Sequence, residues 1–223
     1  MKTIKIKLYE FSELDKAAQQ KALEEWRYIN VDSDNWFDFS LEHFHTLCKA
    51  LGIATDSDKI SFSGFYSQGD GSSFDSEIDP VVLAKSIAQG TWEEVASIGR
   101  LKLSPCPCRQ AVLNLIKAQF IDYTAVTKRP SNGNWVNLEV DFWYDHNQCS
   151  NYQHIENQLN LLKQWLTTVI AALNQYLYRC LEDEYEYLCS NQEVQNTIEA
   201  NNYFFTGEGK PADYILSLSM PNP

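Results

Sequence analysis

The segment FSGFYSQGDGSSF, from Phe62 to Phe74, places aromatic residues around a run of Ser, Gln, Gly and Asp. Free N–H groups in a glycine-rich turn can form an anion-binding nest. The segment matches neither phosphate-binding glycine pattern, G-x-x-x-x-G-K-S/T or G-x-G-x-x-G, and contains no Lys or Arg. Two interpretations stay open. One is a structural β-hairpin that turns at Gln68-Gly69-Asp70-Gly71. The other is a ligand or partner contact made by Tyr66, Ser67, Gln68, Gly69, Asp70, Gly71, Ser72 and Phe74.

A second candidate site combines the cysteines of PCPC with the histidine and cysteine of HNQC. These residues are Cys106, Cys108, His146 and Cys149. Four such ligands could hold zinc in a closed, structural, tetrahedral site. However, C-x-C spacing is less common in zinc sites than C-x-x-C. The PCPC and HNQC segments would lie close together only through the predicted fold. Incidental thiols and imidazoles are the alternative, and we expect no cofactor.

Signatures of catalysis are missing. His43 and His45 are two residues apart, so their side chains point to different faces of a helix and cannot chelate one metal together. The sequence has no H-E-x-x-H, G-x-S-x-G or kinase-type motif. We therefore expect a protein that is not an enzyme, and a small hydrolase with a Cys nucleophile or a metal is an alternative.

The charge of the chain limits its partners. The 223 residues carry a formal net charge of −12, which disfavours binding to nucleic acids or anionic membranes. The run LEDEYEYL, from Leu181 to Leu188, suggests an acidic DNA mimic as one alternative and the solvated end of a helix as another. No stretch approaches the roughly 18 to 20 apolar residues of a membrane span, and the N-terminus lacks the apolar core of a signal peptide. We expect a cytoplasmic protein with reduced cysteines.

The N-terminal part of the chain carries a strand pattern followed by a helix pattern, and the last third carries two helix patterns. Ile4, Ile6 and Leu8 alternate with Lys and Tyr, which predicts a strand, and Ser12 with Asp15 predicts the N-cap of the first helix. A long helix is predicted from Ile155 to Cys189, and Ser190 with Glu193 predicts the cap of the next. The apolar stripe of the long helix comprises Ile155, Leu159, Leu162, Leu166, Val169, Leu173, Leu177 and Leu181.

The middle of the chain predicts four shorter helices and a hairpin. The helices span about Trp36–Leu51, Pro80–Ala88, Trp92–Ile98 and Arg109–Ala118. Asn132-Gly133 predicts the turn of the hairpin that joins FIDYTAVTKR to NWVNLEVDFWYD. The whole chain, residues 1–223, is thus predicted to be a single α+β domain: a mostly antiparallel β-sheet with packed helices, including one long C-terminal helix. A contact between two copies along that helix, giving a homo-oligomer, is an alternative.

Three segments resemble a family of uncharacterised phage and prophage proteins that also occurs on mobile elements. They are FSELDKAAQQKALEEWRYINVDSDNW, KISFSGFYSQGDGSSF and LYRCLEDEYEYLCSNQEVQNTIEANNYFFTGEGK. The central segment is the most specific, and some members carry the label antitoxin. The resemblance implies an accessory protein of a phage or mobile element that binds and neutralises a host defence factor or a toxin. It implies no catalytic residue.

A sponge for a small nucleotide immune messenger is the alternative function. In such a protein aromatic side chains would stack on the bases. The phosphates would be bound by basic residues, for which the candidates are Arg100, Arg109, Lys128 and Arg129.

Overall fold

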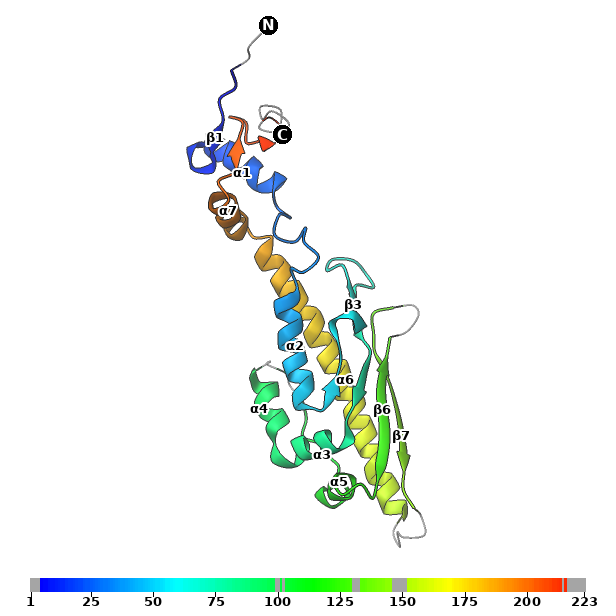
Figure 1. Cartoon of the computed structure of the whole chain (residues 1–223). Coiled ribbons are helices and arrows are strands. Elements are labelled where there is room, and N and C mark those ends of the chain that lie inside the picture. Colours follow the sequence, from blue (N-terminus) through cyan, green and yellow to red (C-terminus); the bar gives the residue numbers. More distant parts are fainter. Residues whose placement is uncertain are drawn as a thin grey trace, which may run out of the picture. The chain divides into compact units, whose positions relative to one another are not determined.

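Two compact units make up the chain. The computed structural model describes residues 5–98, 101, 103–129, 133–145, 152–213 and 215. Unit 1 comprises Met1–Phe37 and Asp183–Pro223, and unit 2 comprises Asp38–Glu182. Helices and antiparallel strands together confirm the predicted α+β class (Figure 1). The single domain over residues 1–223 stays a prediction.

Unit 1 is built from short elements near both ends of the chain. They are β1 (Tyr9–Glu10), the 3-10 turn η1 (Phe11–Glu13), α1 (Lys16–Glu25), α7 (Asn191–Ala200) and β8 (Phe204–Phe205). β1 and β8 pair antiparallel. Their core consists of Phe11, Leu14, Ala18, Ala22, Leu23, Val194, Ile198 and Phe205. Ser190 caps α7 as predicted, with its side chain accepting from the Glu193 N–H.

Two predictions for the N-terminal segment are wrong. Residues 5–8 form no strand, and Ile6 is 54% exposed, because the alternating segment has no partner strand before β1 begins at Tyr9. Ser12 does not cap α1, since it lies inside η1. Asp15 takes that role, and its carboxylate accepts the Ala18 N–H at 2.9 Å.

Unit 2 holds most of the strands and helices. Its elements are α2 (Asp38–Ala50), β2 (Ile53–Ala54), the 3-10 turn η2 (Ser57–Lys59), β3 (Ile60–Ser63), β4 (Gly71–Phe74), β5 (Ser76–Ile78), α3 (Pro80–Gln89), α4 (Thr91–Ile98), α5 (Gln110–Lys117), β6 (Asp122–Lys128), β7 (Asn137–Trp143) and the part of α6 (Tyr152–Leu188) up to Glu182. The four shorter helices predicted for the middle of the chain are confirmed, with ends that differ by at most two residues.

The main sheet has the order β2-β5-β6-β7 and is antiparallel throughout. β6 and β7 pair from Asp122↔Trp143 to Lys128↔Asn137, which confirms the predicted hairpin, although Asn132 lies outside the described residues. Tyr123, Ala125 and Thr127 are buried on one face, whereas the residues between them point to the other. The sheet therefore has one packed and one solvated face, as antiparallel sheets often do.

Helix α6 provides the longest packing surface. All eight residues of the predicted apolar stripe, from Ile155 to Leu181, are buried. In Figure 1 the helix runs behind α2 and the strands. Contacts between helices confirm that α2 packs on it: Ser40 Oγ donates to the Cys180 carbonyl at 3.2 Å, and Tyr176 Oη lies 2.7 Å from His43 Nδ1. Among the described helices, none is both long and apolar enough to cross a membrane.

Candidate functional site

The segment Phe62–Phe74 forms the predicted β-hairpin. β3 and β4 pair antiparallel from Ile60↔Phe74 to Ser63↔Gly71. The connection is longer than the expected turn, because it takes in all seven residues from Gly64 to Asp70. These seven residues are called the hairpin tip below.

The base of the hairpin is buried and the tip is exposed. Ser72 and Phe74 are buried, with the Phe74 ring 5.2 Å from the Phe44 ring. Ser72 Oγ donates to the Asn174 carbonyl at 2.8 Å, and Asn174 Nδ2 donates to the Ser72 carbonyl at 2.7 Å. Of the eight candidate contact residues, Gly71, Ser72 and Phe74 therefore anchor the hairpin to the core. The residues available at the surface lie in the tip, where Tyr66 is 72% exposed.

The Asp70 side chain holds the tip from inside. Its Oδ2 accepts the Tyr66 N–H at 3.0 Å and the Ser67 N–H at 2.6 Å. Gly64 has a φ of 45°, and a Cβ at this residue would clash with the Asp70 carboxylate. Only glycine leaves room for this carboxylate, so Gly64 and Asp70 together fix the backbone that carries Tyr66.

Two residues from other elements hold the tip from outside. Asn134, between β6 and β7, donates from Nδ2 to Ser63 Oγ and to the Gly69 carbonyl, both at 2.7 Å. Tyr178 of α6 donates from its hydroxyl to the Gly64 carbonyl at 3.4 Å. The tip is thus a braced loop, although it is exposed.

Aromatic side chains gather beside the tip. The Phe65 ring centroid lies 6.2 Å from that of Phe62, 6.5 Å from that of Tyr66 and 5.7 Å from that of Tyr178. We call these four residues the aromatic row. Burial raises the pKa of the Tyr178 hydroxyl, and the negative charges of Glu182 and Asp70 raise it further because they disfavour a phenolate beside them.

Sequence reasoning missed the residues that brace the hairpin. Asn134, Asn174 and Tyr178 lie 65, 102 and 114 residues from their partners in the hairpin. No local pattern could have identified them. The one available signal was the helical spacing of Asn174, Tyr178 and Glu182, which places them in one row along α6.

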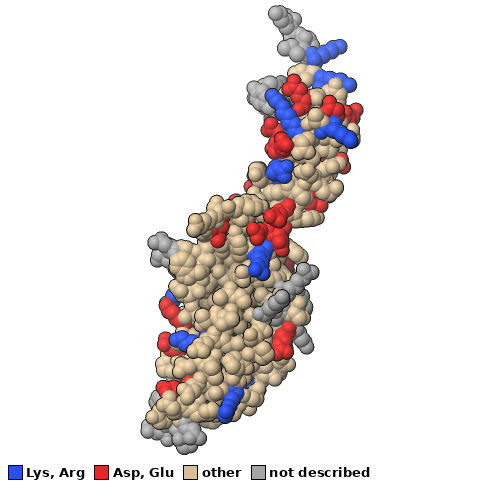
Figure 2. All heavy atoms as spheres, turned by 180° about the vertical axis from the view of Figure 1, so that it is seen from behind, with Lys and Arg blue, Asp and Glu red and all other residues tan. Residues whose placement is uncertain are grey.

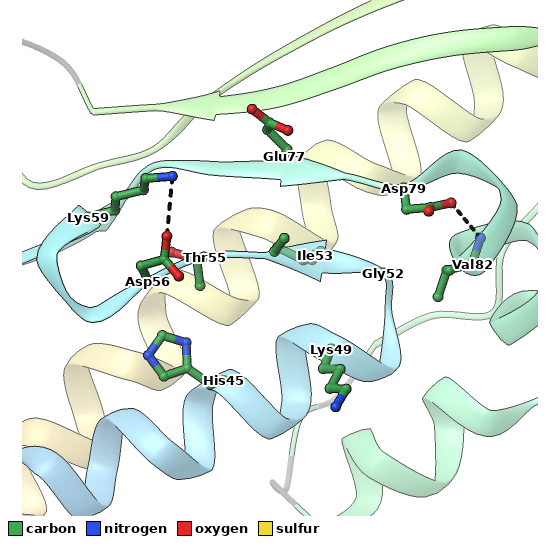
Figure 3. A pocket seen from close by; sticks show the side chains of 11 residues that line it. His45, Lys49, Gly52, Ile53, Thr55, Asp56, Lys59, Glu77, Asp79 and Val82 are labelled. Carbon is green, nitrogen blue, oxygen red and sulfur yellow. Dashed lines mark hydrogen bonds and ion pairs between the residues drawn. The ribbon is translucent and has the colours of Figure 1, made fainter.

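A groove of about 650 Å³ lies elsewhere on unit 2, between α2, β2, η2 and β5 (Figure 3). Its charged residues have both signs, and several are already used by the fold. Lys59 pairs with Asp56 at 3.4 Å, and Asp79 Oδ1 accepts the Val81 and Val82 N–H groups at the start of α3. The His45 ring points toward η2, where Nε2 lies 3.2 Å from Ser57 Oγ. Lys59 and Asp79 in this groove are thus engaged in contacts of the fold itself.

The basic residues considered for a nucleotide are largely occupied. Lys128 pairs with Glu139 at 2.5 Å, and Arg129 Nε pairs with Asp75 at 3.1 Å. Arg109 Nη1 lies 3.3 Å from His154 Nε2, and Arg100 lies outside the described residues. On the face of unit 2 seen in Figure 2, Lys and Arg are scattered singly and most of the surface is uncharged. The described surface therefore lends the nucleotide-sponge alternative little support.

The zinc prediction stays a prediction. Cys106 is half-buried and Cys108 is buried, but His146 and Cys149 lie outside the described residues. Burial raises the pKa of the Cys108 thiol to about 12, and the neighbouring Cys106 adds to the shift. Within the described ranges, no three His, Cys, Asp or Glu side chains are grouped to hold a metal ion.

Comparison with known proteins identifies the family of the chain's larger part. A family model described as "Domain of unknown function (DUF8835)" matches residues 36–191, which is well over half of the chain and includes all of unit 2. No curated protein and no solved structure matches the sequence.

Proposed function

Because the chain belongs to the DUF8835 family, whose function is unknown, we propose a function from the geometry of the hairpin tip. The protein is a non-enzymatic binding protein that holds another protein through this tip. Its target is a host defence factor or a toxin, which it neutralises by occupying the target's surface. The choice of target rests on the resemblance of three segments to phage and prophage proteins.

The observation that carries the proposal is a largely exposed Tyr66 on a braced backbone. Aromatic residues, above all Tyr and Trp, are enriched among the few residues that dominate binding energies at protein interfaces. Binding normally costs free energy for ordering loops and side chains. Asp70 and Asn134 already fix the backbone of the tip, so that part of the cost is lowered before the partner arrives.

The remaining tip residues fit the rim of an interface. Ser67, Gln68 and Gly69 are exposed. The side chains of Ser67 and Gln68 can donate hydrogen bonds to a partner and accept them from it. Tyr66 would then fill a pocket on the partner while its polar neighbours exclude water around it.

The proposal is tested by affinity purification of the full chain from cells of its natural host. Tyr66→Ala is compared with the wild type and with Phe39→Ala, which removes a ring that is 76% exposed on α2. We expect a stoichiometric partner with the wild type and with Phe39→Ala, and its loss with Tyr66→Ala. Retention of the same partner by Tyr66→Ala would contradict a role for the tip.

Neutralisation is tested separately in cells. If the target is a defence factor, expression of the chain should raise the plaquing efficiency of a restricted phage, and if it is a toxin, expression should restore growth. Tyr66→Ala should lose either effect, while Phe39→Ala should keep it. A chain that captures a partner without changing plaquing or growth would be a binding protein with another role.

A further inference from the structure

We propose that the hairpin tip recognises an arginine side chain of the partner protein, through the aromatic row and the carboxylate of Glu182. This inference rests on the proposed function and adds the chemistry of the partner. The guanidinium would stack on an exposed aromatic face while Glu182 accepts its N–H groups.

The aromatic and acidic groups come together through two elements. Tyr178 and Glu182 are four residues apart on α6, so their side chains are neighbours on one helix face. The Tyr178 hydroxyl reaches the Gly64 carbonyl at 3.4 Å, and its ring lies 5.7 Å from the Phe65 ring. The row thus runs from the exposed Tyr66 through Phe65 to Tyr178, and Tyr178 joins it to the helix face on which Glu182 lies.

The electrostatic environment of the row is negative. The charges of Glu182 and Asp70 both disfavour a phenolate at Tyr178, which is why they raise its pKa beyond the effect of burial. The same field favours a cation. The formal net charge of −12 adds long-range attraction for a basic partner surface.

Arginine fits this combination better than lysine. Its planar guanidinium stacks on aromatic faces and forms two parallel hydrogen bonds to a carboxylate. Lysine offers a compact, strongly hydrated charge that stacks less well. A cation over a Tyr or Phe face is attracted by the negative potential of the ring.

The probe is a seven-residue peptide that alternates Arg and Ser, compared with the same peptide carrying neutral citrulline. Binding to the full chain is followed by NMR, using the amide signals of Gly64 and Gly69 and the aromatic signals of Tyr66. We expect the Arg peptide to shift these signals in a saturable way and the citrulline peptide to bind about fivefold or more weakly.

Two variants locate the binding. Tyr66→Ala should weaken the Arg peptide about fivefold or more, and Glu182→Gln about two- to fivefold. The matched control is Glu156→Gln, which removes the same charge from the same helix about 39 Å further along. It should leave the affinity unchanged.

Three results would overturn the inference. Equal losses with Glu182→Gln and Glu156→Gln would mean general attraction to an acidic chain, and equal binding of both peptides would mean an aromatic contact without a cation. Arg-peptide shifts confined to residues away from the tip would place the binding elsewhere. If Tyr66→Ala still loses the captured partner in any of these cases, the proposed function stands and only the arginine assignment fails.

Discussion

Gly71 and Asn134 pack so closely that a Cβ at Gly71 would lie 2.8 Å from Asn134 Cβ. This approach brings the connection between β6 and β7 onto the hairpin, where Asn134 Nδ2 donates to Ser63 Oγ and the Gly69 carbonyl. The missing side chain at Gly71 is thus a condition for the brace on the tip.

Gly71→Ala should therefore lower the free energy of unfolding by about 1–3 kcal/mol, because the new methyl group must displace Asn134. Urea denaturation measures this change. Asn134→Gly removes the clashing Cβ, so the cost of Gly71→Ala should be smaller in that background. Additive effects of the two substitutions would show that the close approach does not limit stability.

Asp70→Ala should loosen the tip while leaving the Tyr66 side chain in place. The Tyr66 and Ser67 N–H groups lose their acceptor, so their hydrogen exchange should accelerate about tenfold or more. Partner capture should fall even though Tyr66 is intact. The control is Gln68→Ala, a neighbouring exposed residue, which should leave both exchange rates unchanged. Unchanged exchange in Asp70→Ala would mean that the carboxylate does not hold the loop.

Asp15→Ala should destabilise unit 1 by about 0.5–2 kcal/mol, because the substitution removes the N-cap of α1. Ser12→Ala serves as the comparison, since Ser12 lies in the preceding 3-10 turn and does not cap α1. Thermal unfolding followed by circular dichroism distinguishes the two. A larger loss of stability with Ser12→Ala would support Ser12 as the N-cap of α1, as the sequence predicted.

Stability should fall as the pH rises above about 9, in part because of Cys48. This thiol is fully buried, and burial raises its pKa above the ordinary value of 9.0. The unfolded chain therefore loses this proton first and binds fewer protons than the folded chain, so the free energy of unfolding decreases with pH. Between pH 7.5 and pH 10 the loss from Cys48 should be on the order of 1 kcal/mol.

Urea unfolding of Cys48→Ala at both pH values tests this assignment. The variant should be less stable at pH 7.5, because it leaves a small cavity, but should lose less stability on going to pH 10. Cys108, whose pKa burial raises to about 12, should give a further loss in both proteins. Equal pH dependence with and without Cys48 would rule out its contribution.

Periodic segments of this chain could be read from sequence alone. The α6 stripe from Ile155 to Leu181 follows a helical repeat over many turns, and every predicted position is buried. The boundary between the units, at Glu182 and Asp183, falls inside this uninterrupted helix, so no linker composition indicated it. The structure of a short segment depends instead on whether a partner strand is present. The alternation from Ile4 to Leu8 is typical of a strand, but no described strand pairs with residues 5–8.

The candidate site was predictable only in part for the same reason. The glycines and Asp70 identified a hairpin with a polar turn. The exposure of its residues depends on contacts with distant side chains. Asn174 and Phe44 bury the base of the hairpin, and Asn134 braces the tip. These contacts join distant parts of the chain, and a local pattern carries no information about them.

The shared bracing of the tip also restricts how the sequence can change over time. Gly64 packs closely on Asp70, and Gly71 on Asn134, so a larger residue at either glycine requires an accommodating change at its partner. In an alignment of relatives, substitutions at the two members of each pair should occur together, although other residues separate them in the sequence. Tyr66 should instead change when the target changes. A lineage that acquires a new target should therefore keep the four bracing residues and replace the ring they present.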